Sequence, residues 1–103
     1  MRYGAKARAN AIASTKAFIS QYPAADTHKY MLLSIMQRVC ERFLINGLVK
    51  FICAQSIDTH IDCMKMIYDS FAEDDRPLWL TRDQIEDYEV RMKLREREVK
   101  ENA

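Results

Sequence analysis

The apolar residues between Thr27 and Asn46 recur with the period of an α-helix. They are spaced mainly four, three and four residues apart, with further apolar neighbours alongside: Leu32, Leu33, Met36, Val39, Cys40, Phe43 and Leu44. A helix with this pattern presents a wide apolar face to a core, and polar residues such as Arg38 and Arg42 take much of the rest. Asp26 or Thr27 can cap its start, and Asn46-Gly47 can end it. We therefore predict a central helix over residues 27–46.

Three other segments have helical patterns. Residues 3–20 are rich in alanine and carry a thin apolar stripe of Ala5, Ala9, Ile12 and Ile19, with Ala13 and Phe18 beside it. A third helix begins among Ser56, Asp58 and Thr59 and ends before Glu73, and its stripe is Ile57, Ile61, Met64, Ile67, Tyr68 and Phe71. The fourth begins at a capping box formed by Thr81 and Gln84, with Leu80 and Ile85 placed as a hydrophobic staple. Its apolar stripe weakens after Met92, so we expect residues 93–103 to project into solvent.

Residues 48–55 are ambiguous. Asn46-Gly47 between apolar residues is a strong hairpin signal, in which Arg42–Ile45 would pair with Leu48–Phe51. A lone two-stranded ribbon is barely stable, and no third strand follows. We favour a short helix over residues 48–55, with the hairpin as the alternative.

Composition supports a helical fold. Hydrophobic residues make up 49% of the chain and charged residues 30%, while it contains only two Gly and two Pro. A protein with many short strands uses more of these turn residues. We predict a single helical domain over residues 1–103, an all-α compact bundle of four to five helices.

The sequence also bears on location. No apolar run approaches the roughly 20 residues that span a bilayer, and no secretory signal is visible. The odd number of cysteines (Cys40, Cys53 and Cys63) is typical of thiols in a reducing compartment. We therefore expect a cytoplasmic protein without membrane contact. The acid-free N-terminus also has the composition of a mitochondrial transit peptide, which makes mitochondria the alternative.

Catalytic motifs are missing from the sequence. It has two histidines, no Gly-rich phosphate loop and no nucleophile elbow, so we predict a protein that is not an enzyme and needs no cofactor. A Cys3His zinc site could form from His60 and Cys63 on one helix face, joined by Cys40 and Cys53, but the spacing matches no common zinc module. His60 could also serve Cys63 as a base. We favour thiols packed as small hydrophobic groups, with no bound metal.

The content of methionine and aromatic residues suggests partner binding. Six Met, five Tyr, four Phe and one Trp occur in this short chain, and such residues are enriched at protein interfaces. We expect a larger protein or protein complex as partner, with the chain acting as a modulator, an inhibitor or an accessory subunit. A mobile element that targets a nucleic-acid-handling enzyme is one such context. The predicted partner-binding residues are Trp79, Tyr88, Arg91, Arg95 and Glu98.

The alternative is a regulatory protein that binds nucleic acid directly. Its contacts would come mainly from the basic first helix, through Arg2, Lys6, Arg8 and Lys16, together with Arg38 and Arg42. The isoelectric point near 7.7 argues against it, since DNA-binding domains commonly exceed about 9. The oligomeric state is left open by the sequence.

Overall fold

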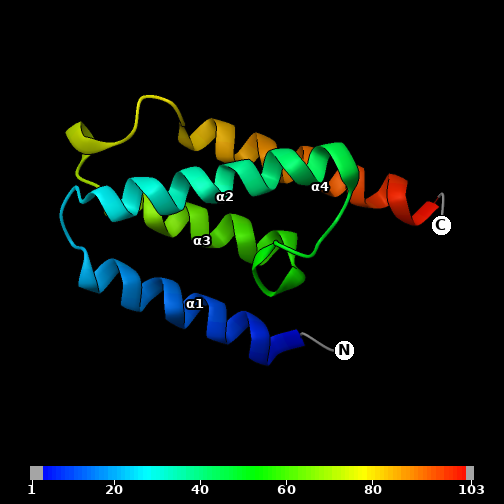
Figure 1. Cartoon of the computed structure of the whole chain (residues 1–103), viewed down its shortest axis with the longest axis horizontal. Helices are drawn as coiled ribbons and strands as arrows, with labels where there is room; N and C mark the ends of the chain where they lie inside the picture. Colours follow the sequence, from blue (N-terminus) through cyan, green and yellow to red (C-terminus); the bar gives the residue numbers. More distant parts are fainter. Residues whose placement is uncertain (1–3, 102–103) are drawn as a thin grey trace.

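The computed structural model describes residues 4–101 and contains four α-helices joined by short loops (Figure 1). No β-strand occurs within these residues. The predicted all-α bundle is therefore confirmed. The helices are α1 (Gly4–Gln21), α2 (Thr27–Asn46), α3 (Ile57–Ser70) and α4 (Arg82–Glu101), with single 3₁₀ turns η1 (Cys53–Gln55) and η2 (Glu73–Asp75).

Helix α3 lies at the centre of the bundle. It packs against α1 on one side and against α2 and α4 on the other, and α2 and α4 also pack against each other. The central position explains why α3 has the most buried residues of the four helices. Its whole predicted apolar stripe is buried, from Ile57 to Phe71.

The predicted face of α2 supplies the second half of the core. Leu33, Met36, Cys40 and Phe43 are buried, and Leu32, Val39 and Leu44 pack against them at the edge. Helix α4 closes the core with Ile85, Tyr88 and Met92. Fully burying an aliphatic side chain contributes about 1.5–3 kcal/mol, so these three faces account for the cohesion of the bundle.

The helix ends follow the predicted capping residues. The Asp26 carboxylate accepts a hydrogen bond from the His28 N–H, and Gly47 ends α2 in the left-handed conformation with a φ of 71°. At the start of α4, the Thr81 hydroxyl accepts from the Gln84 N–H at 3.1 Å, and the Gln84 side chain accepts from the Thr81 N–H at 2.8 Å. This reciprocal pair is the predicted capping box.

The prediction of a short helix over residues 48–55 was wrong, and the described chain forms no hairpin there either. The helical structure is confined to the single turn η1. The left-handed Gly47 ends α2, residues 48–52 form a loop and turn, and the positive φ at Ala54 (53°) and Gln55 (50°) prevents a continuous right-handed helix through the rest of the segment. The segment instead buries Ile52 and directs the chain into α3.

The predicted inner face of α1 was also wrong in part. Ala5, Ala9 and Ala13 are exposed, while Ile12 and Ile19 pack against the core as expected. No residue of α1 is fully buried. Helix α1 is therefore a peripheral element that covers one side of α3.

The end of α4 extends beyond the other helices (Figure 1). Met92 is its last fully buried residue, although Arg95 and Glu96 are half-buried. Within residues 4–101, none of the helices combines the length and apolar character needed to cross a membrane.

Candidate interaction surface

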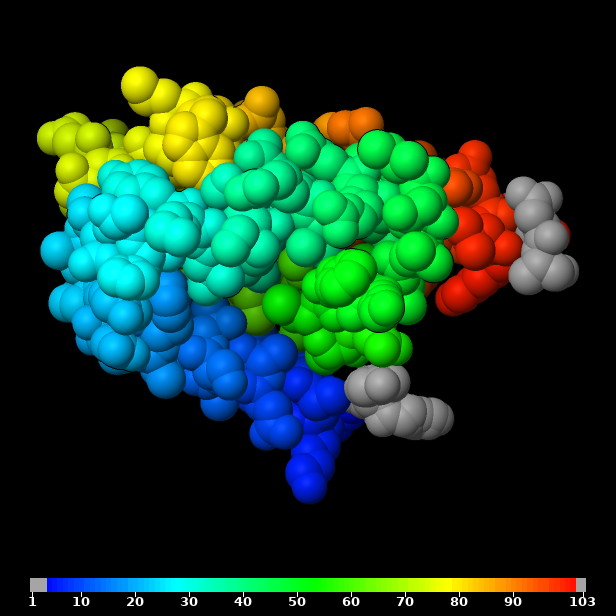
Figure 2. Space-filling model, in the orientation of Figure 1, coloured from blue at the N-terminus to red at the C-terminus, as the bar shows by residue number. Residues whose placement is uncertain are grey.

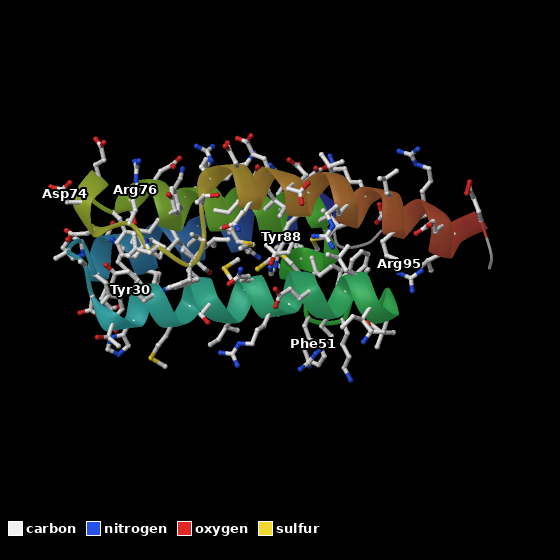
Figure 3. All side chains as sticks on the ribbon, turned by 90° about the horizontal axis from the view of Figure 1, so that it is seen from above. Tyr30, Phe51, Asp74, Arg76, Tyr88 and Arg95 are labelled. Carbon is white, nitrogen blue, oxygen red and sulfur yellow. The ribbon has the colours of Figure 1, made fainter. Side chains whose placement is uncertain are left out.

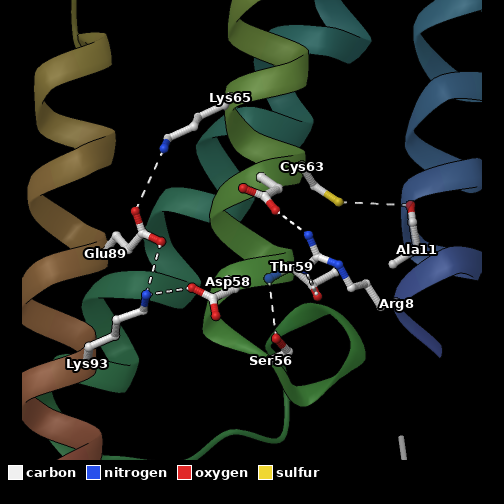
Figure 4. Close-up of polar contacts among 10 residues, drawn as sticks. Arg8, Ala11, Ser56, Asp58, Thr59, Cys63, Lys65, Glu89 and Lys93 are labelled. Carbon is white, nitrogen blue, oxygen red and sulfur yellow. Dashed lines mark hydrogen bonds and ion pairs between the residues drawn. The ribbon is translucent and has the colours of Figure 1, made fainter. Parts of the chain in front are cut away.

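The acidic residues of α3 are held in ion pairs with the neighbouring helices (Figure 4). On the α4 side, the Asp58 carboxylate lies 2.6 Å from the Lys93 ammonium, which also lies 3.4 Å from Glu89. Glu89 in turn lies 3.7 Å from Lys65 of α3. The hydrogen bond from Lys93 lowers the pKa of Asp58. These carboxylates serve the packing of α3 on α4.

The α1 side of α3 is fastened by one arginine. Arg8 donates to the Thr59 hydroxyl at 2.8 Å and to the Asp62 carboxylate at 2.6 Å. The Cys63 thiol lies beneath the same helix, 3.9 Å from the Ala11 carbonyl oxygen. Arg8 is thus engaged within the bundle.

The remaining residues predicted to contact nucleic acid are not brought together into a new site. Arg2 lies outside the described residues. Lys6 and Lys16 are exposed on α1 and make no ion pair within residues 4–101. A shallow hollow of ≈ 370 Å³ lies between Arg8 and Lys16, lined otherwise by Ala5, Ala9, Ile12 and Ala13.

His60 and the cysteines lie near one another, but the His60 ring is fully used. Its Nδ1 accepts a hydrogen bond from the Cys53 N–H at 3.2 Å, and its Nε2 lies 3.0 Å from the Met36 carbonyl oxygen. Neither nitrogen is directed at the Cys63 thiol. Within residues 4–101, no group of three or more His, Cys, Asp or Glu side chains is arranged to hold a metal ion.

The thiols have two different environments. Cys40 packs against the Met64 sulfur at 3.6 Å, and burial raises the pKa of Cys40 to about 12. Cys53 and Cys63 share a hydrogen bond, which lowers the pKa of Cys63 to about 6 and raises the pKa of Cys53. The sequence indicated the cluster, but the division into a lone thiol and a pair depends on the position of η1.

The five predicted partner-binding residues are scattered. Trp79 is 44% exposed beside α2, whereas the Tyr88 ring points between α4 and α2 and its hydroxyl donates to Glu41 (Figure 3). Arg95 donates to the Ile45 carbonyl oxygen at 3.3 Å. Arg91 and Glu98 are exposed on α4, where Arg91 pairs with Asp87 at 3.6 Å. Of this set, Trp79 lies next to a group of exposed apolar residues on α2.

The exposed apolar residues of α2 lie on its outer face, opposite the core. Met31 is 56% exposed, Ile35 48% and Ile45 79%, and Arg38 and Arg42 lie between them. We call these five residues the outer α2 face. Figure 2 views the bundle from this side, and α2 runs across the middle of the view. Sequence reasoning missed this face because it considered Arg38 and Arg42 only as part of the polar side of the helix and as additional contacts for nucleic acid.

Two aromatic side chains border the outer α2 face. On one side Trp79 forms a hollow of ≈ 290 Å³ with Met31, Ile35 and Arg38. On the other side Phe51 forms a hollow of ≈ 240 Å³ with Ile35, Arg38 and Arg42. Figure 3 shows Phe51 at the α2 edge of the bundle. Because both hollows share Ile35 and Arg38, they form one continuous surface.

The charge of this surface is uncompensated. Within residues 4–101, no ion pair joins Arg38, Arg42 or Lys50 to a carboxylate, whereas Asp58, Asp62 and Asp69 of α3 are all paired. Arg42 and Lys50 instead lie 5.9 Å and 5.6 Å from the centre of the Phe51 ring. Large exposed apolar patches on a folded protein mark interaction sites, and this patch is basic as well.

Comparison with known proteins identifies one family. A family model described as Large polyvalent protein-associated domain 11 matches residues 26–92, well over half of the chain. The matched region begins at the cap of α2 and ends at the last fully buried residue of α4. Neither the curated proteins nor the solved structures contain a significant match to this chain.

Proposed function

Because this chain belongs to the large polyvalent protein-associated domain 11 family, we propose that it is a non-enzymatic protein-binding module that works in the context of such proteins. The observation that carries the proposal is the outer α2 face. It joins exposed apolar residues to unpaired arginines on a rigid helix. Aromatic and arginine side chains dominate the energy of protein interfaces, and Trp79 and Phe51 stand at its borders.

The position of this surface in the chain supports the proposal. The outer α2 face, Phe51 and Trp79 all lie within the matched residues 26–92. Lys6, Arg8 and Lys16 lie outside that region, and Arg8 is bound to Asp62. A function common to the family would use the matched region, so binding through α2 is favoured over nucleic-acid binding through α1.

The finer role follows from size and surface chemistry. A small helical bundle acts on its partner by occupying a site or by joining an assembly. We infer a modulator, an inhibitor or an accessory subunit of a larger protein complex, encoded by a mobile element and directed at a nucleic-acid-handling enzyme. Arg91, Arg95 and Glu98 of α4 form a second, weaker candidate surface.

Site-specific photo-crosslinking in the native host tests the proposal. A photoreactive amino acid at Ile35 should crosslink to a discrete protein, and that protein should bind the chain again after separate purification. Val90 of α4, which is 59% exposed, provides the matched control position and should give no such product. Crosslinks to nucleic acid from Lys16, with none to protein from Ile35, would reverse the order of the two hypotheses.

A further inference from the structure

The spacing of the outer α2 face is that of a helix-packing seam. Met31, Ile35, Arg38, Arg42 and Ile45 follow one another at intervals of four, three, four and three residues. This heptad spacing keeps one stripe of a helix facing a second helix along its length. The stripe covers about 21 Å at a rise of 1.5 Å per residue, which is the length of a partner helix of about four turns.

The borders of the stripe also suit a helix. Trp79 and Phe51 stand on opposite sides of α2, and each forms a hollow with Ile35 and Arg38. A helix lying along α2 would place side chains in both hollows. An extended strand would instead need an exposed sheet edge to pair with, and the described residues contain no strand.

Charge determines which helix fits. Arg38 and Arg42 occupy the middle of the seam and have no carboxylate partner within residues 4–101. A partner that covered them with apolar groups alone would bury unpaired charges at a large cost. A partner with carboxylates at the matching positions gains charge-assisted hydrogen bonds instead.

The same charges exclude a second copy of this chain as the occupant. In a symmetric antiparallel pair of α2 helices, Arg38 would face Arg38 of the other copy at the centre of the seam. In a parallel pair, Arg38 and Arg42 would each face their own counterparts. Like charges in register oppose association, so the seam selects a different chain.

We propose that the outer α2 face binds an acidic amphipathic helix, with apolar residues against Met31, Ile35 and Ile45 and carboxylates against Arg38 and Arg42. This inference rests on the proposed protein-binding function and specifies the class of partner. Arg38 and Arg42 determine specificity, whereas Ile35, Trp79 and Phe51 provide most of the apolar contact.

Selection from a displayed library of amphipathic helices tests the inference directly. The helices would have about 20 residues, enough to span the stripe at 1.5 Å per residue, with an apolar seam and an equal choice of Glu and Lys at the flanking positions. The wild-type protein should select Glu opposite the two arginines. The variant Arg38→Glu/Arg42→Glu should select Lys. The matched variant Arg97→Glu/Lys100→Glu, which makes the same charge change at two exposed positions of α4, should select Glu as the wild type does.

The selected acidic helix then provides a quantitative test. Trp79 is the sole tryptophan of the chain and borders the seam, so its fluorescence should change on binding. Affinity should fall at least about tenfold in Arg38→Glu/Arg42→Glu and recover with a helix that has Lys in place of Glu. The affinity of the wild type for the acidic helix and the affinity of the variant for the Lys helix should both fall when salt is added.

Three outcomes would overturn the inference. In the first, the selected helices show no preference between Glu and Lys. In the second, the library yields no helix that binds. In the third, the protein forms a dimer in solution, and Ile35→Ser abolishes that dimer. If Ile35 still crosslinks to a host protein while the library fails, the protein-binding function stands and the acidic-helix inference falls. If both experiments fail, the proposed function falls as well.

Discussion

Replacing His60 with glutamine should remove an acid-sensitive step from the stability of this bundle. His60 is 1% exposed, and its ring joins η1 to α2 through Cys53 and Met36. Because Nδ1 accepts from a backbone N–H, it has no proton in this arrangement, and Nε2 carries the proton donated to the Met36 carbonyl. The ring is therefore neutral and in one tautomer. Protonation would place an N–H on Nδ1 directly against the Cys53 N–H.

The direction of the pH effect follows from burial. Loss of solvent lowers the pKa of His60 below its ordinary value of 6.5, and the hydrogen bond to Met36 opposes this only in part. The unfolded chain then binds a proton that the folded chain excludes. Stability contributed by the neutral ring is present above about pH 6.5 and is lost as pH falls toward the folded pKa. For one group, the free energy of unfolding changes by at most about 1.4 kcal/mol per pH unit.

Chemical denaturation followed by circular dichroism at several pH values between about 5.5 and 7.5 measures this slope. His60→Gln keeps a donor and an acceptor but does not titrate, so its slope should be flatter than that of the wild type by up to about 1.4 kcal/mol per unit. His28→Gln is the control, because His28 is exposed and its contacts with Asp26 and Tyr22 lie at the surface. His60→Ala should cost about 3 kcal/mol at neutral pH, since it leaves a cavity and two unpaired backbone groups. An unchanged slope in His60→Gln would refute the assignment of the neutral tautomer.

Three further predictions concern the periphery of the bundle. Gly47→Ala should lower the free energy of unfolding by about 1–2 kcal/mol, because φ is positive there and the new Cβ would lie 2.8 Å from Val99. Adding Val99→Ala should recover part of this loss. If the effects of the two substitutions on the free energy of unfolding were fully additive, the contact would be contradicted. Arg8→Ala should cost less than about 1 kcal/mol, as expected for an exposed ion pair, yet accelerate hydrogen exchange in α1 well above that in α3. Mild oxidation by a small disulfide should join Cys53 to Cys63 and leave Cys40 reduced, as mapped by peptide mass spectrometry; oxidation of Cys40 first would contradict the pairing.

The sequence was most informative where local chemistry determines the structure. The α2 boundaries follow from Asp26 and Gly47, and the α4 start follows from the Thr81 capping box. These signals act over a few residues and need no tertiary contact. The buried face of α3 could also be predicted from the sequence, because its apolar stripe lies opposite a face of charged residues.

The wrong predictions concern segments whose conformation or orientation depends on tertiary contacts. The positive φ values at Ala54 and Gln55 have no sequence signature, since neither residue favours that region of backbone space. Alanines lie on every side of α1, so the sequence could not indicate that Arg8 faces α3 and that Ala5 and Ala9 face solvent. Likewise, the spacing of three residues placed His60 near Cys63 on one helix face, but it could not show that both ring nitrogens bind backbone groups of other segments.

The outer α2 face was missed for a different reason. Met31, Ile35 and Ile45 lie opposite the core stripe, so α2 has apolar residues on both sides and its amphipathic signal is weakened. The longer stripe was correctly predicted to be buried, but Met31, Ile35 and Ile45 were not recognised as a second apolar face. The longer stripe, centred on Leu33, Cys40 and Phe43, is buried because it packs against the apolar faces of α3 and α4.

The second stripe remains exposed because no element within residues 4–101 packs on it, and the arginines in its middle keep it from packing against a purely apolar surface. Helix α1 does not cover it, because α1 packs on α3 and η1 and is fastened there by Arg8. The matched region of the family ends at Met92, so the bundle core and the outer α2 face belong to the same segment of chain. A binding face built into the core segment, rather than added by α1 or by the last turns of α4, is positioned by the most buried part of the fold.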